Sequence, residues 1–195
     1  MKNLIPVLLL SVLLTSCGGN LVDVAIDNPT EEAIVVTIDS LVVEVPGHEV
    51  VWVEMGRGEH KVILENDSTV IFNFTGDAYM LNPSLTSYLK YEEVYGADMA
   101  ASIANILPSK TVNYLGLELE GNFDVVNELI TPVTWDYGPR EELPEMVEVD
   151  SDENYASLVK LMDPMEFINK MTSAAAEEGI EATEEMPMTD EEVAE

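Results

Sequence analysis

The first part of the chain, from residue 21 to residue 74, alternates short apolar runs with turn residues. Apolar and polar positions follow one another within the runs, so that Val43 and Val45 lie on either side of Glu44. A period of two is typical of a strand that turns one face to a core. Strands are expected at LVDVAID, AIVVTID, LVVEV, EVVWVEM, HKVILE and STVIFNF. Their length and spacing predict a small antiparallel β-sandwich over residues 21–75.

Two details of this region carry expectations of their own. Trp52 stands among valines in the middle of its run, and we expect it to belong to the core. The Gly56-Arg57-Gly58 turn offers two glycines for positive φ angles and predicts a hairpin between the runs on either side.

Residues 76–150 predict a second β-rich region. Gly121-Asn122 and the aromatic block Trp135-Asp136-Tyr137-Gly138-Pro139 are expected to be turns. The expected elements are a strand over 88–95, a short helix from Asp98 to Pro108, a strand over 111–119, and a strand or a helix over 123–130. The fold class is therefore mainly β.

The C-terminal part predicts one helix followed by an acidic tail. In Asp163-Pro164-Met165-Glu166, the aspartate is placed to cap a helix, the proline suits its first turn, and the glutamate completes a capping box. Residues 151–178 are therefore expected to be a helical segment. Its apolar face is expected to contain Phe167, Ile168 and Met171. Residues 179–195 are rich in glutamate and are expected to be disordered.

The N-terminal twenty residues have the layout of an export signal. Lys2 precedes an apolar run over residues 4–14, which is too short to span a bilayer as a helix and ends in Leu14-Thr15-Ser16-Cys17. These four residues resemble the lipobox of bacterial lipoproteins. The resemblance implies that residues 1–16 are a signal peptide, that Cys17 carries the lipid, and that residues 17–20 are a tether. The alternative is an ordinary secretory signal in which the cysteine is incidental.

The same resemblance implies a location. Lipoproteins retained at an inner membrane commonly have aspartate after the lipidated cysteine, and this chain has Gly18. A lipid anchor in the outer membrane of a bacterial cell envelope is expected, with palmitate among the acyl chains. Two further resemblances point to bacterial surfaces: residues 34–60 resemble immunoglobulin-like or PEGA-like β modules, and residues 79–145 resemble lipoproteins of Bacteroidetes-like bacteria.

Charge excludes one class of partner. The chain has 8 Lys and Arg against 38 Asp and Glu, a formal net charge of −30, and loss of Lys2 with the signal makes it −31. Such a surface repels nucleic acid and anionic headgroups alike, so membrane attachment is expected through lipid on Cys17. Envelope proteins or glycans are the expected partners. Adaptation to a salty medium outside the cytoplasm is favoured over cation binding as the reason for this acidity.

Candidate catalytic residues are few. Cys17 is the only cysteine, which excludes internal disulfides and cysteine-rich zinc sites. His48 and His60 are the only histidines and are expected to be solvated turn residues. Asp150-Ser151-Asp152-Glu153-Asn154 begins like an EF-hand loop, but Tyr155 stands where glycine is needed and Leu161 where glutamate is needed. No cofactor and no metal site are expected.

The candidate binding residues are aromatic. Trp135 and Tyr137 are candidates for stacking on a sugar or a peptide, and the alternative is that they fix their turn to the core. The sequence favours a non-catalytic binding, adhesion or assembly role. The alternatives are an envelope hydrolase that uses paired carboxylates and a calcium-dependent acidic surface protein.

Overall fold

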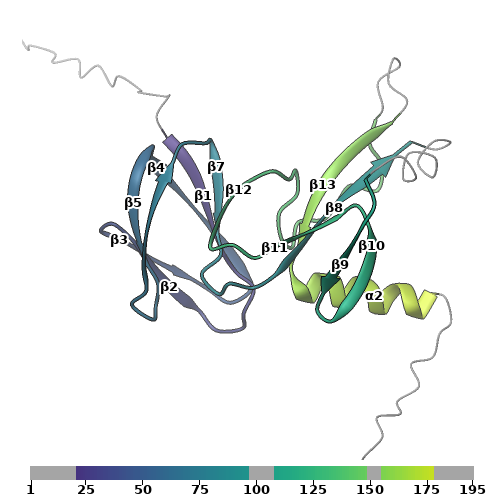
Figure 1. Ribbon diagram of the computed structural model, residues 1–195, viewed down its shortest axis with the longest axis horizontal. Coiled ribbons are helices and arrows are strands. Elements are labelled where there is room, and N and C mark those ends of the chain that lie inside the picture. Colours follow the sequence, from purple (N-terminus) through teal and green to yellow (C-terminus); the bar gives the residue numbers. More distant parts are fainter. Residues whose placement is uncertain (1–20, 97–107, 149–154, 178–195) are drawn as a thin grey trace, which may run out of the picture.

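Strands make up most of the structure. The computed structural model describes residues 21–96, 108–148 and 155–177, and the described residues form thirteen strands and one helix (Figure 1). The expected mainly β fold class is confirmed. The helix in these residues is not long and apolar enough to cross a membrane.

The first sheet has the strand order β12-β7-β1-β4. Its strands are β1 (Leu21–Asn28), β4 (Glu49–Gly56), β7 (Ala78–Leu81) and β12 (Ile130–Pro132). β1 pairs antiparallel with β4 and parallel with β7, and β12 pairs antiparallel with β7. Both β7 and β12 lie in the predicted second region, so the first sheet recruits strands from outside residues 21–75.

The second sheet has the order β3-β2-β5-β6 and is antiparallel throughout. Its strands are β2 (Ile34–Ile38), β3 (Leu41–Val45), β5 (Gly58–Ile63) and β6 (Thr69–Phe74). Between the two sheets lies a core of alternating strand residues, among them Val22, Val24, Ile26, Val36, Ile38, Val45, Val62, Phe74 and Leu81. All six predicted strands of residues 21–74 are confirmed.

The predicted hairpin at Gly56-Arg57-Gly58 is wrong. β4 pairs with β1 in the first sheet, whereas β5 pairs with β2 and β6 in the second. The turn therefore carries the chain from one sheet of the sandwich to the other. Alternation specifies that two strands are present, but it does not specify which neighbour each one pairs with.

A smaller β unit follows in the chain and lies beside the sandwich (Figure 1). Its three-stranded sheet has the order β11-β8-β13, with β8 (Tyr88–Tyr95), β11 (Phe123–Val126) and β13 (Ala156–Met162). The strand predicted over 111–119 is two strands, β9 (Lys110–Tyr114) and β10 (Leu117–Gly121). Leu115 and Gly116 both have positive φ angles and reverse the chain between them. The undecided residues 123–130 begin as strand β11, and the helix predicted from Asp98 lies outside the described residues.

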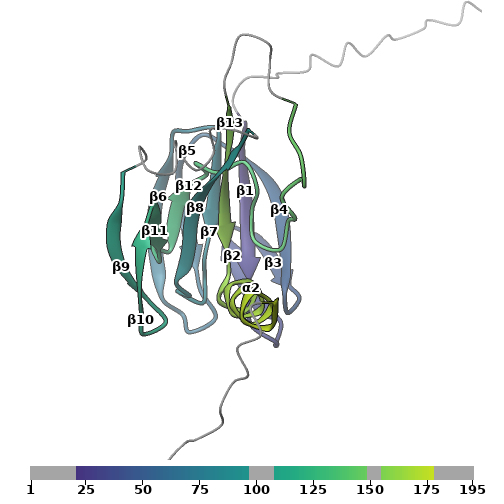
Figure 2. The ribbon, with the colours of Figure 1, turned by 90° about the vertical axis from the view of Figure 1, so that its right-hand side faces the viewer.

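Helix α2 (Pro164–Glu177) is seen nearly end-on in Figure 2, and its start confirms the predicted capping box. Asp163 Oδ1 accepts a hydrogen bond of 2.8 Å from the Glu166 amide, and Glu166 Oε2 accepts one of 3.0 Å from the Asp163 amide. The helical segment predicted over 151–178 is wrong for its first part, because Ala156–Met162 is strand β13, paired with β8. Phe167 is buried, whereas Ile168 and Met171 remain exposed. The predicted acidic tail lies outside the described residues.

Candidate functional site

The outer face of the first sheet carries the contact with the second unit. One row across this face, read from the strand register, contains Trp52, Ala25, Met80 and Thr131. Met80 is buried, and it packs in a cluster with Tyr88, Val126 and Leu161 of the second unit. At the other end of the row Trp52 is 56% exposed. The second unit thus covers this face up to β4 and leaves the edge open.

A groove lies at this open edge. It has a volume of about 170 Å³ and lies between the outer face of β4 and the segment that follows β12. The residues lining it are Val50, Trp52, Val133, Trp135, Asp136, Gly138, Pro139 and Glu141. The chain contains two tryptophans, and both line this groove, which we call the two-tryptophan groove.

The expectation that Trp52 belongs to the core is wrong. Val51 and Val53 turn toward the sandwich core and pack against it, and the pleat therefore directs Trp52 outward. The alternation that predicted the strand already contained this information. A tryptophan on the outer face of a strand was the signal that sequence reasoning missed.

The two candidate aromatic residues behave differently. Trp135 is half-buried, packs against the Met80 cluster and lines the groove. Tyr137 is half-buried too, but it forms an isolated parallel bridge with Lys160 and is absent from the groove lining. The structure brings Trp135 together with Trp52, whereas the backbone of Tyr137 fixes the turn to β13. Binding at Trp135 and Tyr137 stays a prediction.

Backbone hydrogen bonds hold the groove wall in place. The Asp136 and Tyr137 amides donate to the Val159 carbonyl over 2.8 and 3.1 Å, and the Leu161 amide donates to the Tyr137 carbonyl over 2.9 Å. Asp136 Oδ2 accepts from the Val159 amide at 2.8 Å. The wall is therefore an extra strand-like segment attached to β13, and this attachment makes the groove preformed.

Side chains hold the same wall from the other end. Glu141 Oε2 accepts a hydrogen bond of 2.6 Å from the Gly138 amide. Lys160, which is almost fully buried, donates to the Gly138 carbonyl over 2.6 Å and forms an ion pair of 2.8 Å with Glu166. These contacts tie the turn at Gly138 to both β13 and the first turn of α2.

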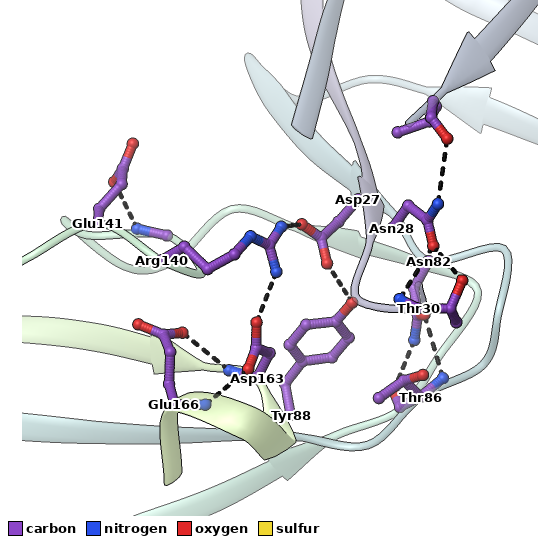
Figure 3. Close-up of polar contacts among 12 residues, drawn as sticks. Asp27, Asn28, Thr30, Asn82, Thr86, Tyr88, Arg140, Glu141, Asp163 and Glu166 are labelled. Atoms are coloured by element: carbon purple, nitrogen blue, oxygen red, sulfur yellow. Dashed lines mark hydrogen bonds and ion pairs between the residues drawn. The ribbon is translucent and has the colours of Figure 1, made fainter. Parts of the chain in front are cut away.

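Arg140 is the centre of a buried ionic junction (Figure 3). Its guanidinium forms ion pairs with Asp27 at the end of β1 and with Asp163 at the start of α2, the latter at 2.6 Å. Asp27 also accepts a hydrogen bond from the Tyr88 hydroxyl. The Asp27 and Asp163 side chains are 0% and 2% exposed, and Arg140 is 23% exposed. This junction joins the sandwich, the groove wall and the helix at one point.

The junction shifts the titration of its members. Burial raises the pKa of Asp27, although the hydrogen bond from Tyr88 and the charge of Arg140 act in the opposite direction. Burial, followed by the nearby Asp27 carboxylate, raises the pKa of the Tyr88 hydroxyl. The phenol therefore remains a hydrogen-bond donor to Asp27 across the physiological pH range.

The chemistry of this junction is structural. Its acid with a raised pKa, Asp27, is absent from the lining of the two-tryptophan groove and its side chain is 0% exposed. Its two oxygens face Tyr88 and Arg140. A general acid needs contact with a substrate in a cleft, and this carboxyl group is enclosed by the fold.

The histidines are not a pair. His60 is not the solvated turn residue that we expected, since its side chain is only 14% exposed. Its Nδ1 lies 2.7 Å from Asp39 Oδ2 and its Nε2 lies 2.8 Å from the Gly56 carbonyl oxygen. His48 is exposed and adopts a positive φ of 59° in its turn. The His60 ring therefore connects the turn after β2 to the end of β4.

Metal binding finds no support in the part of the chain that the structure describes. No group of three or more His, Cys, Asp or Glu side chains is arranged there to hold an ion. The EF-hand-like residues 150–154 lie outside the described residues.

Comparison with known proteins adds no family: no protein-family model matches the chain, and no curated protein or solved structure is significantly similar to it.

Proposed function

We propose that the protein is a lipid-anchored, non-catalytic binding module of a bacterial cell envelope that holds its ligand in the two-tryptophan groove. The lipobox at Cys17 supports the anchor. The observation that carries the binding role is the convergence of both tryptophans of the chain on one preformed groove. Exposed tryptophan in a rigid, mostly apolar site is the usual anchor of a recognition surface.

The anchor determines where the groove stands relative to the bilayer. Leu21 begins β1 only four residues after Cys17, a reach of about 14 Å when fully extended. Trp52 pairs with Ala25, four residues further along β1, which adds about 13 Å. The groove therefore lies within roughly 30 Å of the lipid attachment, close enough to take a ligand at the membrane surface. An outer-membrane location remains part of this proposal.

The hydrolase alternative receives less support. Paired carboxylates need a substrate between them, and the two buried carboxylates of the described residues, Asp27 and Asp163, share Arg140 instead. At the groove, Asp136 and Glu141 each accept a hydrogen bond from a backbone amide. Both acidic pairs are used to position the chain.

The anchor is tested by metabolic labelling. The full-length protein, expressed in a bacterium that processes lipoproteins, should incorporate labelled palmitate and sediment with membranes. Cys17→Ser should lose both the label and the sedimentation. A wild-type protein that is exported and cleaved without taking up palmitate contradicts the anchor.

The groove is tested by intrinsic fluorescence. Because both tryptophans line it, their emission responds to a ligand that enters this groove. Titration with fractionated envelope protein or glycan should shift the emission of the wild type, and Trp52→Ala should abolish the saturable response. Ile71→Ala is the matched control, since Ile71 is 67% exposed on the second sheet. A response that survives Trp52→Ala rejects the groove as the binding site.

A further inference from the structure

β4 offers a complete free edge beside the groove. All eight of its residues pair with β1, from Leu21↔Gly56 to Asn28↔Glu49, without a bulge. β4 is the last strand in the sheet order, and within the described residues no strand pairs with its other side. The outward backbone N–H and C=O groups of an edge strand form a ready template for a further strand.

This edge lacks the usual protection. Natural sheets guard their edges with short strands, proline, lysine or bulges. At the opposite edge of the same sheet, β12 has three residues and ends in Pro132, so it follows this rule. β4 has an uninterrupted apolar centre, Val50-Val51-Trp52-Val53, and contains neither proline nor lysine. The contrast within one sheet marks β4 as the edge kept open.

The groove lies where an added strand would place a side chain. Val50 and Trp52 project from β4 into the groove, opposite Trp135 and Pro139 on its wall. Alternate residues of a strand added to β4 would point to this same face. The residue paired with Trp52 would therefore enter the groove, which provides side-chain selectivity in addition to the backbone hydrogen bonds.

Charge identifies the occupant. Glu49 and Glu54 lie near the two ends of β4, and Asp136 and Glu141 line the groove. A second copy would add the carboxylates of its own β4 to the same edge, which is unfavourable, and two bodies of formal charge −30 repel each other. A strand with basic residues near Glu49 and Glu54 would pair with these carboxylates and would also be attracted by the negative charge of the whole protein.

We propose that β4 accepts an extended peptide segment of a partner protein as an additional strand, with an apolar side chain in the two-tryptophan groove and basic residues near Glu49 and Glu54. This inference rests on the proposed function and specifies its ligand. It makes the protein an envelope receptor for an extended, basic and apolar segment.

The test uses the mature chain with Cys17→Ser and a random library of linear twelve-residue peptides. Enriched peptides should alternate apolar residues and carry Lys or Arg on either side of them. A bound synthetic peptide should protect the amides of β4 from hydrogen exchange. Methylation of alternate peptide nitrogens, on the edge that faces β4, should weaken binding at least tenfold, while methylation on the other edge should have little effect.

Two variants of Trp52 test the site, and one variant elsewhere is their control. Trp52→Ala should weaken the peptide at least tenfold, as expected for a tryptophan anchor. Trp52→Lys should also block pairing by placing a charge in the middle of the edge. Val42→Lys is the matched control, because Val42 is 64% exposed on the edge strand β3 of the other sheet. It should bind the peptide as the wild type does.

Each other outcome overturns the inference in a recognisable way. Saturable binding of a neutral oligosaccharide that needs Trp52, without peptide enrichment, makes the groove a sugar site and leaves the proposed function intact. A concentration-dependent dimer that Trp52→Lys abolishes makes a second copy the occupant. Absence of any Trp52-dependent binding of peptide, oligosaccharide or envelope fraction rejects the proposed function together with the inference.

Discussion

The buried ionic junction and the two-tryptophan groove lie on the same face of one sheet, yet they are built from opposite chemistry. At the junction, Asp27, Arg140 and Asp163 bury charge where the two units meet. At the groove, Trp52 leaves a large apolar surface in solvent at the edge. Buried charge costs desolvation energy and exposed tryptophan loses burial energy, so neither is explained by stability alone. The junction fixes the position of the groove wall, and the exposed tryptophan provides a surface on which a ligand can bind.

The largest expected effect comes from Arg140→Ala. The substitution leaves Asp27 and Asp163 buried without their cation, and removal of one partner of a buried pair costs about 3–5 kcal/mol. Chemical denaturation should show this loss in the free energy of unfolding. Arg57→Ala is the matched control, since the Arg57–Asp77 pair is largely exposed and its loss should cost less than about 1 kcal/mol. Equal costs for the two variants would show that the junction does not hold the units together.

The contrast also shows what sequence patterns reveal. The capping box at Asp163 and Glu166 and the alternation of β1 to β6 are local signals, and the structure confirms both. Arg140 meets Asp27 across 113 residues, and no local pattern records such a meeting. For the same reason the pairing of β4 with β1 instead of β5, and the recruitment of β7 and β12, could not be predicted.

At the candidate site, too, local signals predict one part and long-range pairing determines the rest. The turn identifies Trp135 as a candidate, but the expectation that Trp52 lies in the core is wrong, because the valines on either side of it take the inward positions. Their meeting in one groove depends on the wall being carried back to β13 through Asp136 and Tyr137. That return is a long-range event set by backbone pairing. The sequence therefore identifies Trp135 as a candidate, and only the fold shows that Trp52 lines the same groove.

The second expected effect separates the two tryptophans. Trp135 packs against the Met80 cluster as well as lining the groove, so Trp135→Ala should remove buried contacts and cost about 2–3 kcal/mol. Thermal unfolding followed by circular dichroism measures this cost. If Trp135→Ala unfolds at the same temperature as the wild type, the wall does not depend on its packing against the second unit.

The third expected effect is a pH dependence of the junction. Because the pKa of Asp27 is raised in the folded protein, its protonated form is favoured by folding. The stability that this group contributes is present below its unfolded pKa of about 3.9 and is lost as the pH rises through its folded pKa. The stability advantage of the wild type over Asp27→Asn should therefore shrink between acidic and neutral pH.

Parallel denaturation of the two proteins over this range measures the change. Asp39→Asn is a suitable comparison, because the hydrogen bond that the Lys61 backbone amide donates to the Asp39 carboxylate, aided by His60, lowers the pKa of Asp39. Its contribution has the opposite sign: it is present above the unfolded pKa and is lost as the pH falls. The two differences should change with pH in opposite directions. If they run in parallel, Asp27 is not held in the environment described here.

The smallest effect on stability, and the most informative one, is expected for Trp52→Ala. More than half of this side chain already contacts solvent, so its removal should change the free energy of unfolding by less than about 1 kcal/mol. Denaturation should therefore hardly distinguish the variant from the wild type, whereas ligand binding at the groove should fall at least tenfold. A large loss of stability would mean that Trp52 completes the core after all. A stable variant without binding would show that the fold keeps this side chain in solvent for recognition, because nothing in its packing requires it there.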